Sequence, residues 1–102
     1  MIPAVDILGT TYTVKHCESI DADGNELAGQ IIYNSAEIEI AYGMPPDVER
    51  LTVLHELIHG VLVHTGHSKH CRNEDLVEAV SNGLVYLLRH NPALVAYLTE
   101  SK

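Results

Sequence analysis

The side chains best suited to chemistry lie in one short stretch, residues 54–59, which reads Leu-His-Glu-Leu-Ile-His and contains a complete H-E-x-x-H motif. On an α-helix, His55 and His59 would lie about 40° apart and one turn from each other, so both imidazoles can bind one zinc ion. Glu56 would lie about 100° around the helix from His55, within reach of a water molecule held by the metal. The motif therefore predicts two metal ligands and a general base.

The residues around this motif are apolar on most sides of the expected helix. Those on the side of His55 are Leu51, Leu54, Ile58 and Leu62, and those on the opposite side are Val53, Leu57, Gly60 and Val61. Such a helix belongs in the centre of a domain, where histidines and a glutamate are costly to bury without a partner. A metal ion would be that partner. The alternative is an ordinary helix whose histidines make structural contacts alone.

Composition limits the class of protein. With 102 residues, 46% of them hydrophobic, we expect one folded domain spanning residues 1–102. A net charge of −8 and six scattered basic residues argue against a nucleic-acid surface. Two cysteines do not describe a disulfide scaffold. Neither a signal peptide nor an apolar run of about 18 residues is visible, so we expect a cytoplasmic protein with no membrane partner.

The first half of the chain predicts strands within about residues 8–41. Residues 8–17 are rich in β-branched and aromatic side chains, and residues 21–25 are typical of a plain turn. Residues 30–33 and 36–41 indicate a hairpin, because Ile38 and Ile40 alternate with glutamates in its second arm. We therefore expect a three-stranded, largely antiparallel sheet.

The second half predicts helices. The active-site helix should run from about residue 47 to about residue 64, where Thr65 and Gly66 end it. A second helix is expected over about residues 73–90 and a short one over about 92–100, with a histidine-rich loop at residues 64–72. The predicted fold is α+β, with the sheet packed on the central H-E-x-x-H helix and two further helices behind it.

A catalytic zinc ion needs a third protein ligand and an open position for water. The metzincin continuation of the motif would need Gly and His where this chain has Leu62 and Thr65, so that pattern is absent. The remaining candidates are His64, His67, His70 and Cys71 in the loop and Glu74 and Glu78 on the next helix. Glu74 and Glu78 share a helix face one turn apart, and spacing does not choose between them.

The run from Glu78 to Asn82 resembles the second signature of the gluzincins, the thermolysin-like zinc peptidases. Together, residues 52–60 and 78–84 resemble the short ImmA/IrrE-type metallopeptidases encoded by phages and prophages, a likeness covering roughly residues 29–90. The resemblance implies a minimal zincin fold and one zinc ion per chain, bound by His55, His59 and Glu78. It also implies that Asn82 supports a zinc-binding histidine. Val63 departs from the family, in which many members have a further histidine there.

The same resemblance implies hydrolysis of a peptide bond in a protein substrate, with Glu56 as general base, and suggests a host or phage regulator as that substrate. It further implies that an edge strand near the metal binds the substrate backbone. The arm expected to do so comprises Ile38, Glu39, Ile40, Ala41 and Tyr42. The group that stabilises the oxyanion is left open among Tyr42, Tyr86 and His90.

Three alternatives stay open. The histidine-rich loop is either a solvated connector, which we favour slightly, or a gate in which His67 or His70 approaches the metal. If a loop histidine or Cys71 closes the fourth metal position, the protein holds or senses zinc without catalysis. Residues 59–67 also resemble the all-histidine zinc site of YbeY-type endoribonucleases. Compared with that site, His64 of this chain lies one position too early, and the aspartate expected before His67 is missing. The acidic net charge also disfavours an RNA substrate.

Overall fold

Four strands form one mixed sheet in the computed structural model, which describes residues 2–22 and 24–100. These strands are β1 (Ala4–Ile7), β2 (Thr10–Cys17), β5 (Gly29–Ile32) and β6 (Glu37–Ala41). Their order across the sheet is β1-β2-β6-β5, so β1 and β5 are the edges. The α+β class is confirmed, whereas the expected three-stranded, largely antiparallel sheet is wrong in both strand number and pairing.

The extra strand and the parallel pairing have separate causes. β1 and β2 form a tight antiparallel hairpin through Leu8 and Gly9, which both have positive φ, at 50° and 97°. Such a two-residue turn matches the twist of the strands that it joins. β2 and β6 run parallel, and parallel neighbours need a long crossover connection. Residues 18–36 supply that connection and place β5 on the outside of the sheet.

The connection itself contains a second, very small sheet. β3 (Asp21–Ala22) and β4 (Asn25–Glu26) pair antiparallel where a plain turn is expected, and Asp23 lies outside the described residues. The hairpin of β5 and β6 is confirmed, with Ile31 opposite Ile38.

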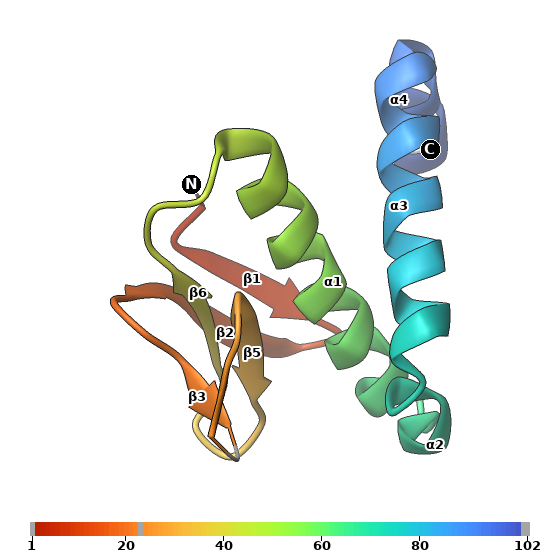
Figure 1. Cartoon of the computed structure of the whole chain (residues 1–102). Helices are drawn as coiled ribbons and strands as arrows, with labels where there is room; N and C mark the ends of the chain where they lie inside the picture. The colour runs from red at the N-terminus through yellow and green to blue at the C-terminus, as the bar shows by residue number, and fades with distance from the viewer. Residues whose placement is uncertain (1, 23, 101–102) are drawn as a thin grey trace.

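Four helices follow the strands: α1 (Pro46–His64), α2 (Ser68–Cys71), α3 (Glu74–His90) and α4 (Pro92–Thr99). The three expected helices are confirmed to within a residue at each end. The histidine-rich segment differs from the expected loop, because it contains the single helical turn α2. Figure 1 shows α1 between the sheet and α3, so the motif helix lies at the centre of the fold. No helix in the described part of the chain combines the length and apolar character that crossing a membrane requires.

The core lies between the sheet and α1, and it depends on a close approach of the two. Its buried members are Ile7, Tyr12, Val14, Ile38, Ile40 and Val53. A Cβ added at Gly60 of α1 would come within 2.7 Å of the Ile7 Cδ1 atom, and one added at Gly29 of β5 within 2.9 Å of the Thr52 Cγ2 atom. Glycine at these two positions therefore lets the motif helix lie tightly against the strands, and especially against edge strand β5.

Candidate metal centre

Three side chains converge at one point beside α1. The Nε2 atoms of His55 and His59 lie 3.1 Å apart, and the Glu74 Oε1 atom lies 3.1 Å from the first and 2.7 Å from the second. The three donor atoms all lie within 4.8 Å of one another, so His55, His59 and Glu74 can hold a metal ion.

The spacing of these atoms suits a small tetrahedral cation. Bonds of about 2.0–2.2 Å from zinc to histidine nitrogen and carboxylate oxygen place neighbouring tetrahedral ligands about 3.3 Å apart. The observed separations of 2.7–3.1 Å need an expansion of a few tenths of an ångström. Both imidazoles are well covered, with 19% and 11% of their side chains exposed, whereas Glu74 is 67% exposed. The histidines therefore form the buried wall, and the carboxylate closes the site from the solvent side.

A tight reversal of the chain brings Glu74 to the histidines. α1 ends at a glycine turn in which Gly66, at φ 82°, donates its N–H to the Val63 carbonyl and His67 donates to the Leu62 carbonyl. After α2, the Asn73 side chain caps α3 by accepting a hydrogen bond from the backbone N–H of Leu76 at 3.1 Å. Glu74 is thus the first residue of α3, where the positive end of the helix dipole favours a carboxylate.

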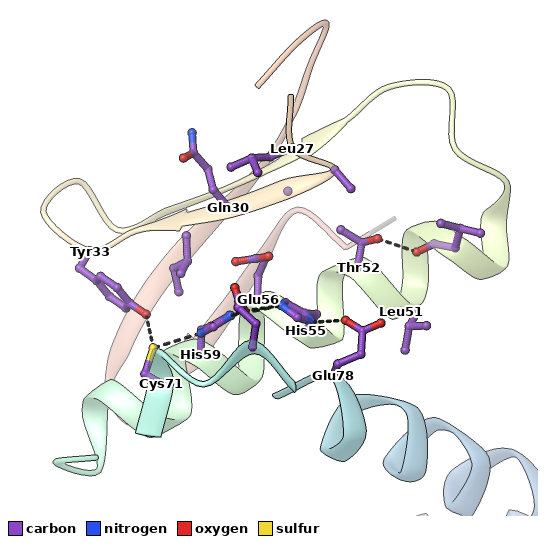
Figure 2. A pocket seen from close by; sticks show the side chains of 15 residues that line it. Leu27, Gln30, Tyr33, Leu51, Thr52, His55, Glu56, His59, Cys71 and Glu78 are labelled. Atoms are coloured by element: carbon purple, nitrogen blue, oxygen red, sulfur yellow. Dashed lines mark hydrogen bonds and ion pairs between the residues drawn. The ribbon is translucent and has the colours of Figure 1, made fainter. Parts of the chain in front are cut away.

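Each imidazole also has a partner on its second nitrogen (Figure 2). The Glu78 Oε2 atom lies 3.5 Å from the His55 Nδ1 atom, and the Cys71 Sγ atom lies 3.1 Å from the His59 Nδ1 atom. The residue that the gluzincin resemblance implies as third ligand is therefore at the outer nitrogen of His55. Glu74, the alternative one turn earlier, occupies the point where the two Nε2 atoms meet.

Glu56 points from α1 into the space between the helix and β5 (Figure 2). It is 7% exposed, and burial raises the pKa of its carboxyl from 4.5 to about 7. Attraction to His59 works against this rise, and repulsion from Glu74 adds to it. A carboxylate with a pKa near neutrality beside a candidate metal site is suited to accept a proton and return it.

The site opens into a cavity of about 620 Å³. The floor is formed by His55, Glu56 and His59. The opposite wall is formed by residues 27–31, which are the first three residues of β5 and the two residues before it. Among the other lining residues, Leu51 lies on α1 and Tyr33 just after β5. Edge strand β5 therefore lies directly across the cavity from His55 and His59.

This arrangement corrects the expected role of residues 38–42. β6 is hydrogen-bonded to β2 on one side and β5 on the other, so the backbone from Ile38 to Ala41 has no free edge for another strand. Tyr42 stacks on His16 with ring centroids 5.1 Å apart and does not line the cavity. The edge position belongs to β5, because the crossover after β2 places β6 inside the sheet.

The other predicted residues lie away from the convergence point. The His64 Nε2 atom pairs with the Tyr12 hydroxyl at 2.7 Å, and His67 and His70 are exposed, with ring centroids 6.0 Å apart. Asn82 is exposed on α3 and does not line the cavity. The outer nitrogens that it was expected to support have Glu78 and Cys71 as partners.

The residues expected to stabilise the oxyanion also lie outside the cavity lining. Tyr86 and His90 stack on each other with centroids 4.0 Å apart, on the far part of α3, and neither lines the cavity. Tyr33, which sequence reasoning missed, does line it. Partial burial and a hydrogen bond with Cys71 raise the pKa of the Tyr33 phenol well above its ordinary value, so it stays a neutral hydroxyl. The sequence feature that could have identified Tyr33 is its position at the end of a predicted hairpin arm.

No family model, curated protein or solved structure matches this chain.

Proposed function

We propose that the protein is a small zinc-dependent peptidase in which His55, His59 and Glu74 bind the metal and Glu56 is the general base. The single observation that carries this proposal is the convergence of two imidazole Nε2 atoms and one carboxylate oxygen next to a buried glutamate. Two histidines and a carboxylate are the ligand set of zinc peptidases, whereas structural zinc sites have four protein ligands. Here three donors converge among the described residues.

The choice of Glu74 over Glu78 rests on which ring nitrogens the two carboxylates approach. Glu74 lies within 3.1 Å of both Nε2 atoms, whereas Glu78 lies 3.5 Å from the Nδ1 atom of His55. A histidine can bind a metal through Nε2 while its Nδ1–H donates to a carboxylate, which orients the ring and raises its basicity. We therefore assign Glu78 to the support of His55.

A bound zinc ion would polarise a substrate carbonyl and lower the pKa of water towards about 7. In this chain Glu56 would accept the proton as water attacks and then deliver it to the leaving amine. The histidines and Glu74 would fix the metal against the floor of the cavity. Tyr33 is the tyrosine that lines this cavity, and its hydroxyl can donate a hydrogen bond to polar groups there.

The position of β5 supports an extended peptide as the substrate. The backbone N–H of Ala41 donates to the carbonyl of Ala28, so alternation along the pair directs the backbone groups of Gly29 and Ile31 away from β6. A peptide can pair with these free groups by adding a strand to the sheet edge. It would then lie between β5 and the metal-binding side chains. The earlier assignment of this role to residues 38–42 is replaced by Gly29–Ile32.

The test compares wild type with the Glu56→Gln variant on a panel of unfolded proteins. The variant should keep about one zinc ion per chain and lose cleavage by orders of magnitude, because it keeps the ligands and loses the base. His59→Ala, as the matched control, should lose both zinc and cleavage. If wild type and Glu56→Gln bind zinc equally and both fail to cleave any substrate, the protein is a metal-holding protein and the peptidase proposal is wrong.

A second arm tests the substrate geometry. Once a cleaved peptide is known, methylating its backbone nitrogens one at a time should raise KM at alternate positions, because pairing with β5 uses every second N–H. A uniform effect at all positions would contradict strand addition.

A further inference from the structure

Cys71 lies in a short polar segment, yet its sulfur contacts side chains from two other elements of the fold. It is the last residue of α2, it is half-buried, and its Sγ atom points at the back of the His59 ring, 3.1 Å from Nδ1 (Figure 2). The Tyr33 hydroxyl lies 3.6 Å from the same sulfur. Side chains from the end of the β5 hairpin arm, from α2 and from α1 are thus joined in one short chain of polar contacts that ends at a metal-binding residue.

The direction of the hydrogen bond decides what this contact does. A neutral imidazole carries one proton, and the nitrogen without it is the acceptor or the metal ligand. Without a metal, the Glu74 carboxylate lies 2.7 Å from His59 Nε2, so a proton occupies that contact. When a metal takes its place, Nε2 must present its lone pair, and the remaining ring proton must lie on Nδ1, where Sγ can accept it. If instead the proton were on Nε2, this nitrogen would be unable to bind a metal. The contact that favours metal binding is therefore the one in which sulfur accepts.

We propose that Cys71 is a positioning residue for the metal centre: its sulfur accepts a hydrogen bond from Nδ1–H of His59 and holds that ring in the metal-binding tautomer. This inference rests on the proposed zinc site. It adds a function for a residue that lines the cavity and is not one of the three proposed metal ligands. It also gives the two histidines different supports, a carboxylate from Glu78 behind His55 and a thiol sulfur behind His59.

The backbone around Cys71 is built to keep the sulfur in place. The Cys71 N–H donates to the His67 carbonyl at 3.1 Å, which closes the turn of α2, and Asn73 donates to the His70 carbonyl at 3.0 Å before α3 begins. The glycine turn at Gly66 fixes where this segment starts. These contacts fix the backbone of Cys71 beside α1, so its sulfur can lie against the His59 ring.

The experiment compares Cys71→Ala, Cys71→Ser and, as a matched control, Cys17→Ala, whose cysteine lies on β2. Zinc affinity is measured by competition with a chelator, and NMR of the zinc-loaded protein measures how fast the His59 Nδ1–H exchanges with water. Loss of a supporting group behind a metal-binding histidine typically lowers metal affinity about 10–100-fold. We expect that loss for Cys71→Ala, together with faster exchange of the His59 Nδ1–H. Cys71→Ser should recover most of the affinity, since a hydroxyl oxygen also accepts, and Cys17→Ala should match wild type.

Two results would overturn the proposal. One is a zinc-loaded wild type whose His59 Nδ1–H exchanges with water as fast as in Cys71→Ala. The other is an equal loss of zinc affinity in Cys71→Ala and Cys71→Ser with unchanged exchange of the His59 Nδ1–H, which would make Cys71 a packing residue. Failure of the zinc site itself gives a different result, because wild type would then bind no zinc at all.

Discussion

Replacing Glu56 by Gln is expected to stabilise the metal-free protein at about pH 8 and to change its stability little at about pH 4. The reason is burial: the carboxyl is 7% exposed, and its pKa rises from 4.5 to about 7 in the folded protein. Between these two values the folded state binds more protons than the unfolded state, so the contribution of Glu56 to the unfolding free energy falls as pH rises. Above pH 7 the ionised carboxylate imposes its full cost.

The size of the effect follows from the two pKa values. One pKa unit corresponds to about 1.4 kcal/mol, so the rise from 4.5 to about 7 costs the folded state about 3 kcal/mol at alkaline pH. Gln has nearly the shape of the protonated acid and carries no charge, so it removes this cost. Urea unfolding of both proteins in a chelating buffer, between about pH 4 and pH 8, gives the difference directly.

The control is Glu18→Gln, because Glu18 lies just after β2 and its side chain is exposed to solvent. Its effect on stability should vary much less across the same pH range. Excess zinc should reduce the advantage of Glu56→Gln, since a nearby cation favours the carboxylate. A difference between Glu56→Gln and wild type that stays flat from about pH 4 to pH 8 would refute a buried, ionisable Glu56.

Three further outcomes are expected. In the proposed site Glu74 is a metal ligand and Glu78 supports His55, so Glu74→Gln should weaken zinc binding by more than the about 10–100-fold loss expected for Glu78→Gln. Chelator competition measures both losses, and the reverse order would restore Glu78 as the ligand. Gly29→Ala should destabilise the protein by about 1–3 kcal/mol in urea unfolding, because its Cβ would approach the Glu39 carbonyl oxygen to 3.1 Å. A Cβ added at Gly83 on α3 would meet no atom of the described residues within 4 Å, so Gly83→Ala should instead stabilise the protein by about 0.5–1 kcal/mol. Equal changes in stability for Gly29→Ala and Gly83→Ala would contradict the close approach of β5 to α1.

Local signals in the sequence were sufficient for α1, α3 and α4 and for the motif, but not for the single turn α2. Proline and aspartate at the start of α1, and Thr65 with Gly66 at its end, act within a few residues, so the helix bounds were predictable. The geometry of His55 and His59 follows from helical repeat alone. The hairpin of β5 and β6 was likewise local, since alternation of Ile and Glu needs no distant partner.

The order of the strands and the identity of the proposed third ligand depend on contacts between distant residues. Nothing local shows that β6 pairs with β2 in parallel, because that choice depends on how residues 18–36 cross the sheet. Glu74 and Glu78 share one helix face, so periodicity treats them alike. The glycine turn, α2 and the Asn73 cap together set the start of α3 beside the histidines, and this start selects Glu74. The glycine turn and α2 also place Cys71 beside His59.

The segment from residue 60 to residue 73 has a consequence for how the molecule moves. An ion shared by His59 and Glu74 would fasten the two ends of that segment together and so close a loop in the chain. α3 and α4 lie on the side of α1 away from the sheet (Figure 1), so this fastening would tie the C-terminal helices to the rest of the molecule. Chelation should therefore let α3 and α4 swing as a unit about residues 65–73. Amide hydrogen exchange would register this as faster exchange in both helices, with the sheet unaffected.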